Sequence, residues 1–317
     1  MKSKPPLRIL LCAPRGFCAG VVRAIDVVEK ALVIYGAPVY VRHEIVHNKH
    51  VVDSLKAKGV VFISHLAEAP AGDRPVIFSA HGVAKAVSEE AKTRNLLTID
   101  ATCPLVTKVH REAQVHHKRG RHVLLIGHPG HPEVIGTIGQ LPAGATTLIG
   151  SVDEVEALDF SADAPLAYVT QTTLSVDDSR EIVAALQRRF PAIHAPPLED
   201  ICYATANRQE AVKRAAAEVE AVIVVGAANS SNSQRLREVA ERAGCALAVL
   251  APNAAAIDWP RFAGVRSLAV TAGASAPEIL VEEILDAFAQ RFAIAVETLT
   301  TTEESMFFPL PRALREA

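Results

Sequence analysis

Short apolar runs rich in β-branched residues alternate with amphipathic helical stretches along almost all of the 317-residue chain. The strand-like runs are apolar throughout, which is typical of strands buried on both faces in parallel sheets that helices cover. The expected strands are Arg8–Cys12, Val39–Val41, Val60–Ile63, Val76–Phe78, Val123–Ile126, Leu166–Val169, Val222–Val225, Leu247–Leu250 and Ser267–Val270. The expected helices are Val21–Tyr35, Ala84–Arg94, Thr107–Lys118, Val176–Phe190, Glu210–Glu220, Gln234–Ala243 and Pro277–Phe292. The pattern predicts an α/β protein.

The expected elements divide into three stretches of similar length, which a chain of this size can accommodate as separate α/β units. The stretches are residues 7–101, 102–201 and 202–291. Residues 292–317 follow as a C-terminal tail, which we expect to be extended and packed on the body because it carries Pro309 and Pro311.

Composition argues against two classes of partner. The 33 Lys and Arg residues nearly balance the 35 Asp and Glu residues, so we expect no broad nucleic-acid surface, and the 5% aromatic content weakens any base-stacking role. No apolar run approaches the roughly 18 residues needed to span a membrane. The run Ile9–Leu11 is too short for a signal peptide, so we expect a cytoplasmic protein with reduced cysteines.

Three of the five cysteines, Cys18, Cys103 and Cys202, each lie ahead of an expected helix and near the start of one stretch. A helix N-terminus lowers the pKa of a thiol and so favours the thiolate that metals require. Three thiolates without a fourth suggest an iron–sulfur cluster with one iron open to substrate. The alternative is that each is an ordinary small buried residue, which is our interpretation of Cys12 and Cys245.

Polar side chains follow several of the expected strands. They are His47, His81, His128, His131, Glu133, the Ser and Asn residues of 229–233, and Ser275. Ligands of parallel α/β sheets bind beyond the carboxyl ends of the strands, where helix N-termini attract phosphate. This inventory suits a diphosphate, although Ser and Asn at a helix start are more often caps. No P-loop and no GxGxxG motif is present, so nucleotide binding has no support.

Several long segments carry a family resemblance. They are PRGFCAG (14–20), RHEIVHN (42–48), FSAHGV (78–83), DATCPLVTKVH (100–110), GHPGHPE (127–133), TQTTLSVDD (170–178), DICYATANRQEAV (200–212), NSSNS (229–233) and TAGASAPE (271–278). In this order and over almost the whole chain, they resemble the LytB-type iron–sulfur reductases, the 4-hydroxy-3-methylbut-2-enyl diphosphate reductases of the non-mevalonate isoprenoid pathway.

The resemblance implies three similar α/β units in a trefoil-like arrangement around a central iron–sulfur cavity. It implies a [4Fe-4S] cluster held by Cys18, Cys103 and Cys202, whose fourth iron takes the hydroxyl oxygen of the substrate. The residues that it places around the diphosphate are His47, His81, His131, Ser230, Asn232 and Ser275, with Ser231 nearby. Thr172 would bind the substrate near the departing hydroxyl and assist catalysis, and Glu133 would supply protons.

The reaction that the resemblance implies is the reductive dehydroxylation of a small allylic diphosphate, (E)-4-hydroxy-3-methylbut-2-enyl diphosphate, to isopentenyl and dimethylallyl diphosphate. A ferredoxin or flavodoxin-type protein is the expected electron donor. An open-iron hydro-lyase acting on a small phosphorylated substrate is the main alternative, and it would need no donor. A zinc hydrolase lacks support because the chain has no short CxxC pairs. A non-catalytic iron–sulfur module would need neither Glu133 nor Thr172.

Overall fold

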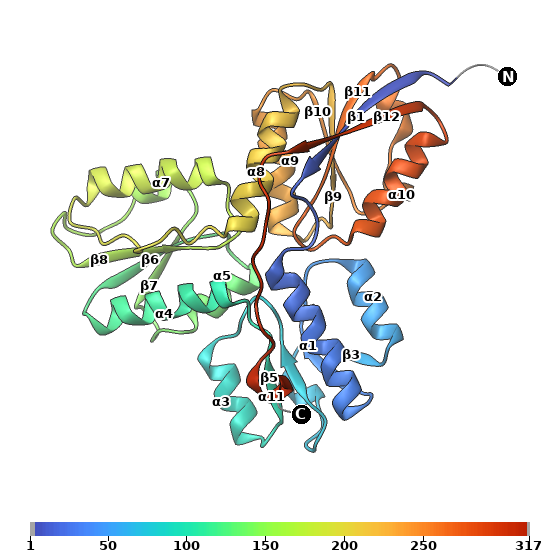
Figure 1. Cartoon of the computed structure of the whole chain (residues 1–317). Coiled ribbons are helices and arrows are strands. Elements are labelled where there is room, and N and C mark those ends of the chain that lie inside the picture. Colours follow the sequence, from blue (N-terminus) through green and yellow to red (C-terminus); the bar gives the residue numbers. More distant parts are fainter. Residues whose placement is uncertain (1–3, 316–317) are drawn as a thin grey trace. The chain divides into compact units, whose positions relative to one another are not determined.

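The computed structural model describes residues 4–315, which form two compact units (Figure 1). Unit 1 contains residues 4–18, 47–49 and 203–307, and unit 2 contains residues 19–46, 50–202 and 308–315.

Unit 1 is built on a five-stranded parallel sheet with the strand order β10-β9-β11-β1-β12. Its strands are β1 (Pro6–Ala13), β9 (Ala221–Val225), β10 (Leu247–Ala251), β11 (Ser267–Ala272) and β12 (Ala293–Thr300). Helices α8 (Tyr203–Ala216) and α9 (Ser231–Arg242) cover one face, and α10 (Glu278–Ala289) covers the other. The short helices η2 (Ala254–Ala256) and η3 (Trp259–Phe262) lie on the α10 side.

Alternate residues of the central strands enter the two cores of unit 1. Ile9 and Ile223 pack with Phe288 of α10, whereas Leu10 and Val222 face α8 and α9. Because both faces are covered, successive strand residues are all apolar, and each large buried side chain contributes about 1.5–3 kcal/mol of hydrophobic stabilisation.

Unit 2 contains two further parallel sheets. The four-stranded sheet has the order β3-β2-β4-β5, with β2 (Val39–Arg42), β3 (Val60–Ile63), β4 (Val76–Phe78) and β5 (Thr98–Asp100). The helices of this part are α1 (Ala19–Tyr35), α2 (Lys49–Ala57), α3 (Lys85–Thr93), the short η1 (Leu66–Glu68) and α11 (Arg312–Arg315).

The three-stranded sheet of unit 2 has the order β7-β6-β8, with β6 (His122–Ile126), β7 (Thr146–Ile149) and β8 (Leu166–Thr170). Helices α4 (Pro104–Lys118) and α5 (Pro132–Ile138) pack on one face through Val109, Ala113 and Val134. Helices α6 (Val152–Glu156) and α7 (Val176–Arg189) pack on the opposite face.

The predicted α/β class and the predicted parallel strands are confirmed, and every expected strand lies within an observed one. At both ends of the chain, strands pair differently from what three separate stretches would give. Strand β1 pairs with β11 and β12, and β12 occupies part of the expected extended tail. Edge strand β12 is mostly exposed, and its apolar residues 293–296 follow the expected helix without a break, which is why the sequence pattern missed it. The exact division into three stretches stays a prediction.

Arg208, on α8, is the largest fully buried side chain and ties three segments of unit 1 together. Its guanidinium donates to the carbonyl oxygen of Gly16 at 3.1 and 2.8 Å and to both carboxylate oxygens of Glu304 at 2.9 and 3.2 Å. Gly16 itself has φ of 65°, and a Cβ there would lie 3.1 Å from the carbonyl oxygen of Ala276, so this close approach requires glycine. Arg208 thus fixes the loop that leads into Cys18.

We expect Arg208→Met to lower the free energy of unfolding by about 3 kcal/mol, because it leaves a poorly exposed carboxylate and several carbonyl groups without their donor. Denaturant unfolding monitored by circular dichroism measures the change. Arg214→Met on the same helix removes only an exposed pair with Glu210 and should cost at most about 1 kcal/mol. Equal losses in the two variants would contradict the structural role of Arg208.

Candidate active site

Glu133 lies in the first turn of α5, and only 3% of its surface is exposed. The chain leaves β6, turns through residues 127–130, and begins α5 with His131 as the N-cap and Pro132 in the first turn. The Nδ1 atom of His131 accepts a hydrogen bond from the backbone N–H of Glu133 at 3.2 Å. Cap and proline together start the helix at this point and direct Glu133 into the interior.

Thr172 holds both oxygens of the Glu133 carboxyl group. Its backbone N–H donates to Oε1 at 2.7 Å, and its hydroxyl donates to Oε2 at 2.9 Å. Burial raises the pKa of Glu133 to about 7, the hydrogen bonds from Thr172 oppose this shift, and the negative charge of Asp200 adds to it. A carboxyl group that titrates near neutral pH can both give up and regain a proton, which is what a general acid requires.

Two of the candidate thiols lie in unit 2 on anchored backbone. Cys103 is the N-cap of α4, and its N–H donates to the carbonyl oxygen of Ala80 at 3.0 Å. The N–H of Cys202 donates to the carbonyl oxygen of Thr172 at 3.1 Å. One residue, Thr172, therefore contacts both the buried acid and the backbone of a candidate ligand.

His81 and His131 approach each other from the two sheets of unit 2, with ring centroids 5.7 Å apart in an edge-to-face arrangement. The Nδ1 atom of His81 lies 3.3 Å from the hydroxyl of Ser79. The next residue, Gly82, has φ of 78°, and a Cβ there would lie 2.7 Å from the ring of His110. Glycine lets this loop turn close to α4, and this turn places His81 beside His131.

The candidate diphosphate residues of unit 1 gather around the start of α9 and the loop after β11. Ser230 caps α9 and accepts hydrogen bonds from the N–H and the hydroxyl of Ser233 at 3.4 and 3.1 Å. Ser275 donates through its hydroxyl to the carbonyl oxygen of His47 at 3.0 Å. Ser231 is the first residue of α9.

Asn232 occupies the next position of α9, and only 6% of its surface is exposed. Its Oδ1 atom has no hydrogen-bond partner among the described residues. A buried amide group of this kind, in the first turn of a twelve-residue helix, is suited to meet a polar ligand.

Cys18 lies in unit 1, where its N–H donates to the carbonyl oxygen of Ala274 at 3.3 Å. It is thus anchored to the loop that carries Ser275. Unit 1 brings Cys18, His47, Ser230, Ser231, Asn232 and Ser275 onto neighbouring segments, and unit 2 does so for Cys103, Cys202, His81, His131, Glu133 and Thr172. Within residues 4–315, no group of three or more His, Cys, Asp or Glu side chains is placed to hold a metal ion. The three-cysteine set stays a prediction.

Cys12 and Cys245 are core residues, as expected, with exposed fractions of 0% and 4%. Burial raises the pKa of the Cys12 thiol to about 12, and burial also raises the pKa of Cys245. The three candidate ligands are only partly buried, and none of the five cysteines forms a disulfide.

The sequence interpretation did not single out Lys108, Gln171 and Asp200. These three residues of unit 2 hydrogen-bond to segments that carry candidate site residues. Gln171 accepts from the N–H of His128 at 3.0 Å through Oε1, and Asp200 accepts from Lys108 at 2.8 Å and from the N–H of Thr170 at 2.9 Å. All three lie in motifs that also contain candidate site residues, and this proximity is the feature of the sequence that could have pointed to them.

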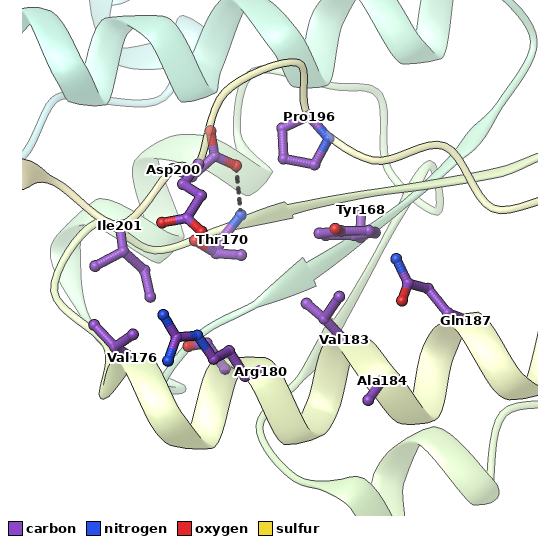
Figure 2. Close-up of a pocket in the computed structure, with 12 residues that line it drawn as sticks. Tyr168, Thr170, Val176, Arg180, Val183, Ala184, Gln187, Pro196, Asp200 and Ile201 are labelled. Atoms are coloured by element: carbon purple, nitrogen blue, oxygen red, sulfur yellow. Dashed lines mark hydrogen bonds between the residues drawn. The ribbon is translucent and has the colours of Figure 1, made fainter. Parts of the chain in front are cut away.

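A pocket of about 300 Å³ lies between β8, α7 and the segment that leads to Cys202. Figure 2 shows Tyr168, Val183 and Pro196 around it, with Asp200 hydrogen-bonded to the backbone of Thr170. None of the candidate substrate residues and none of the candidate cysteines lines this pocket.

Comparison with known proteins connects this geometry to a family. The pattern of the LytB protein family matches residues 9–289. The chain belongs to the LytB family. The 4-hydroxy-3-methylbut-2-enyl diphosphate reductase of Methylocella silvestris is 66% identical over 317 residues, covering 100% of this chain and 99% of the relative. The protein of the same name from Paracoccus denitrificans is 58% identical over 317 residues, all of both chains.

Solved structures agree with this assignment. The E-1-hydroxy-2-methyl-but-2-enyl-4-diphosphate reductase of Plasmodium falciparum superposes with a TM-score of 0.95 at 38% identity, over 98% of each chain. A second solved reductase, described as the terminal enzyme of the non-mevalonate pathway, has a TM-score of 0.63 at 32% identity and covers 90% of this chain and 99% of its own. LytB proteins are iron–sulfur enzymes. Among the helices of residues 4–315, none is both long and apolar enough to span a membrane.

The raised pKa of Glu133 predicts a pH-dependent stability. Between the ordinary value of 4.5 and the folded value of about 7, the native state binds more protons than the unfolded state. The free energy of unfolding therefore falls as pH rises through this range. Glu133→Gln removes this contribution, so we expect the stability difference between variant and wild type to change by about 2 kcal/mol between about pH 5 and pH 7.5.

Denaturant unfolding at several pH values measures this dependence. Glu282→Gln, at an exposed position of α10, is the matched control and should leave the pH profile unchanged. A Glu133→Gln profile parallel to that of the wild type would show that Glu133 titrates at its ordinary pKa.

Proposed function

We propose that this chain catalyses the two-electron, two-proton reductive dehydroxylation of (E)-4-hydroxy-3-methylbut-2-enyl diphosphate to isopentenyl and dimethylallyl diphosphate. Relatives that carry the name of this reductase match the chain over its full length. The observation that carries the chemistry is the contact set of Thr172, which holds the buried carboxyl group of Glu133 and the backbone of Cys202.

The proposed cofactor is a [4Fe-4S] cluster with Cys18, Cys103 and Cys202 as ligands. Soft thiolates are the ligands that iron–sulfur clusters require, and these three cysteines are partly exposed, whereas Cys12 and Cys245 are buried in the cores. When bound, the cluster supplies electrons one at a time and a Lewis-acidic iron that helps the hydroxyl group depart as water.

Glu133 is the proposed proton donor, and Thr172 orients it. With a pKa of about 7, a large share of the carboxyl groups carry a proton at neutral pH, and Thr172 limits their rotation by contacting both oxygens. General acid catalysis of this kind contributes roughly 10²- to 10⁴-fold to a rate. Thr172 would also hydrogen-bond near the departing hydroxyl.

The diphosphate is proposed to bind to His47, His81, His131, Ser230, Ser231, Asn232 and Ser275. In His131, Nδ1 accepts the N–H of Glu133, so the neutral ring carries its proton on Nε2 and can donate it to phosphate. The N-terminus of α9 adds partial positive charge. Binding energy from this remote group fixes the reacting carbon in place.

The proposed partner is a ferredoxin or flavodoxin-type electron donor, and the proposed location is the cytoplasm, where such donors and reduced thiols occur together. An open-iron hydro-lyase is the second candidate function, since the same thiols and acid could serve it. Product formation that depends on a reduced donor separates the reductase from the hydro-lyase.

Metal analysis tests the three-cysteine assignment. Protein purified without oxygen should contain iron and acid-labile sulfide in equal amounts, about four of each per chain. Replacing Cys18, Cys103 or Cys202 by Ser should reduce this content strongly, because each change removes one of three thiolate ligands. Cys245→Ser is the matched control and should retain the wild-type content. Zinc, or no metal after anaerobic reconstitution, would contradict the cluster.

Steady-state turnover with a reduced donor tests Glu133. Glu133→Gln keeps the shape of the side chain and an oxygen for the N–H of Thr172, so the variant should bind iron and sulfide normally. It lacks the acidic proton, so we expect its kcat to fall by roughly 10²-fold or more. Wild-type turnover in this variant would remove Glu133 from the mechanism.

A further inference from the structure

Lys108 connects the helix that begins at Cys103 to the segment that ends at Cys202. It lies just over one turn into α4, and its ammonium group donates to the Oδ1 atom of Asp200 at 2.8 Å. The same group donates to the carbonyl oxygens of Leu198 at 2.8 Å and Glu199 at 3.2 Å. Asp200 stands two residues before Cys202, so the path from one thiol-bearing residue to the other is short.

The contact between Lys108 and Asp200 is largely buried, and all three N–H donors of the Lys108 ammonium group have acceptors. The side chain of Asp200 is 0% exposed and that of Lys108 is 24% exposed. An ammonium group has three N–H donors, and Lys108 has three oxygen acceptors within 3.2 Å. A group with every donor satisfied has one preferred position, which makes this contact more restrictive than a surface ion pair.

Asp200 is held from a second side as well. Its Oδ2 atom accepts the N–H of Thr170 at the end of β8, as Figure 2 shows. The segment before Cys202 is therefore fixed to α4 through Lys108 and to β8 through Thr170. Glu112, the other carboxylate near Lys108, is farther away at 3.5 Å. Lys108 therefore acts mainly on the segment of residues 198–200.

We propose that Lys108 is a positioning residue that sets the separation of Cys103 and Cys202. The part of this proposal that concerns the cluster rests on the proposed function: by fixing two of three ligands, Lys108 controls how firmly the cluster is retained and how it is distorted. Groups behind metal ligands commonly have such effects, and their loss changes metal affinity roughly 10- to 100-fold.

The separation of the two thiols can be measured without any cluster. Nitroxide labels on Cys103 and Cys202 of the apoprotein, in a Cys18→Ser background, report a distance distribution by dipolar EPR. Cys12 and Cys245 are buried and remain unlabelled. We expect Lys108→Met to widen the distribution by roughly twofold, because the variant loses a charged hydrogen-bond donor from a buried site.

Three further variants keep this measurement decisive. Lys108→Met combined with Asp200→Asn removes the fully buried carboxylate that the single variant leaves without its cation, so it remains folded if the single variant does not, and it should widen the distribution as well. Lys108→Arg retains charge and donors and should restore part of the narrow distribution. Lys118→Met, at the exposed end of α4, is the matched control and should resemble the wild type.

The reconstituted enzyme gives the second readout. In Lys108→Met we expect a chelator to remove iron roughly tenfold faster, the EPR spectrum of the reduced cluster to change, and kcat to fall with little change in KM. A wild-type distance distribution in both Lys108→Met and the double variant would overturn the proposal, as would equal widening in Lys118→Met. If the wild-type chain accepts no cluster, the proposed function fails, and the nitroxide distances still decide the role of Lys108.

Discussion

The backbone and hydroxyl of Thr172 form the contact on which the proposed chemistry of unit 2 depends. Its N–H and hydroxyl hold the two oxygens of Glu133, and its carbonyl oxygen holds the N–H of Cys202. The parallel sheet makes this possible, because the chain leaves β6 and β8 at the same edge and the two loops meet there. A shift of one loop would therefore move the acid and the candidate ligand together.

Unit 1 follows the same principle with different side chains. The carboxyl ends of β1, β9 and β11 lead into the loops that carry Cys18, Ser230 and Ser275. Cys18 is bonded to the β11 loop through Ala274, and Arg208 holds the loop before it from the other side. Both units thus place a thiol on a backbone that is fixed by several hydrogen bonds, which reduces the conformational entropy that ligand binding would otherwise have to overcome.

The sequence predicted the strands well because their burial on two faces produces continuous apolar runs, and the family resemblance named the candidate site residues, whose roles stay predictions. It could not show the bidentate contact between Thr172 and Glu133, since the two residues are distant in the chain and their contact depends on the pairing of β6 with β8. Likewise, β12 is a mostly exposed edge strand whose apolar residues directly continue those of the expected helix before it, and its pairing with β1 defines it. The apolar pattern of the sequence therefore does not contain the information on which distant strands pair with each other.

The ion pair of Lys108 and Asp200 bears both on the position of the segment before Cys202 and on the pKa of Glu133. Burial is the first cause of the raised pKa of Glu133, and the charge of Asp200 raises this pKa further. The partner cation Lys108, 2.8 Å from Asp200, offsets part of the field of this anion. The same contact that fixes the approach to Cys202 therefore also moderates the charge of Asp200 that acts on Glu133. Apolar residues in place of this pair could fill the space, but they would provide neither the three anchoring hydrogen bonds of Lys108 nor the charge that acts on Glu133.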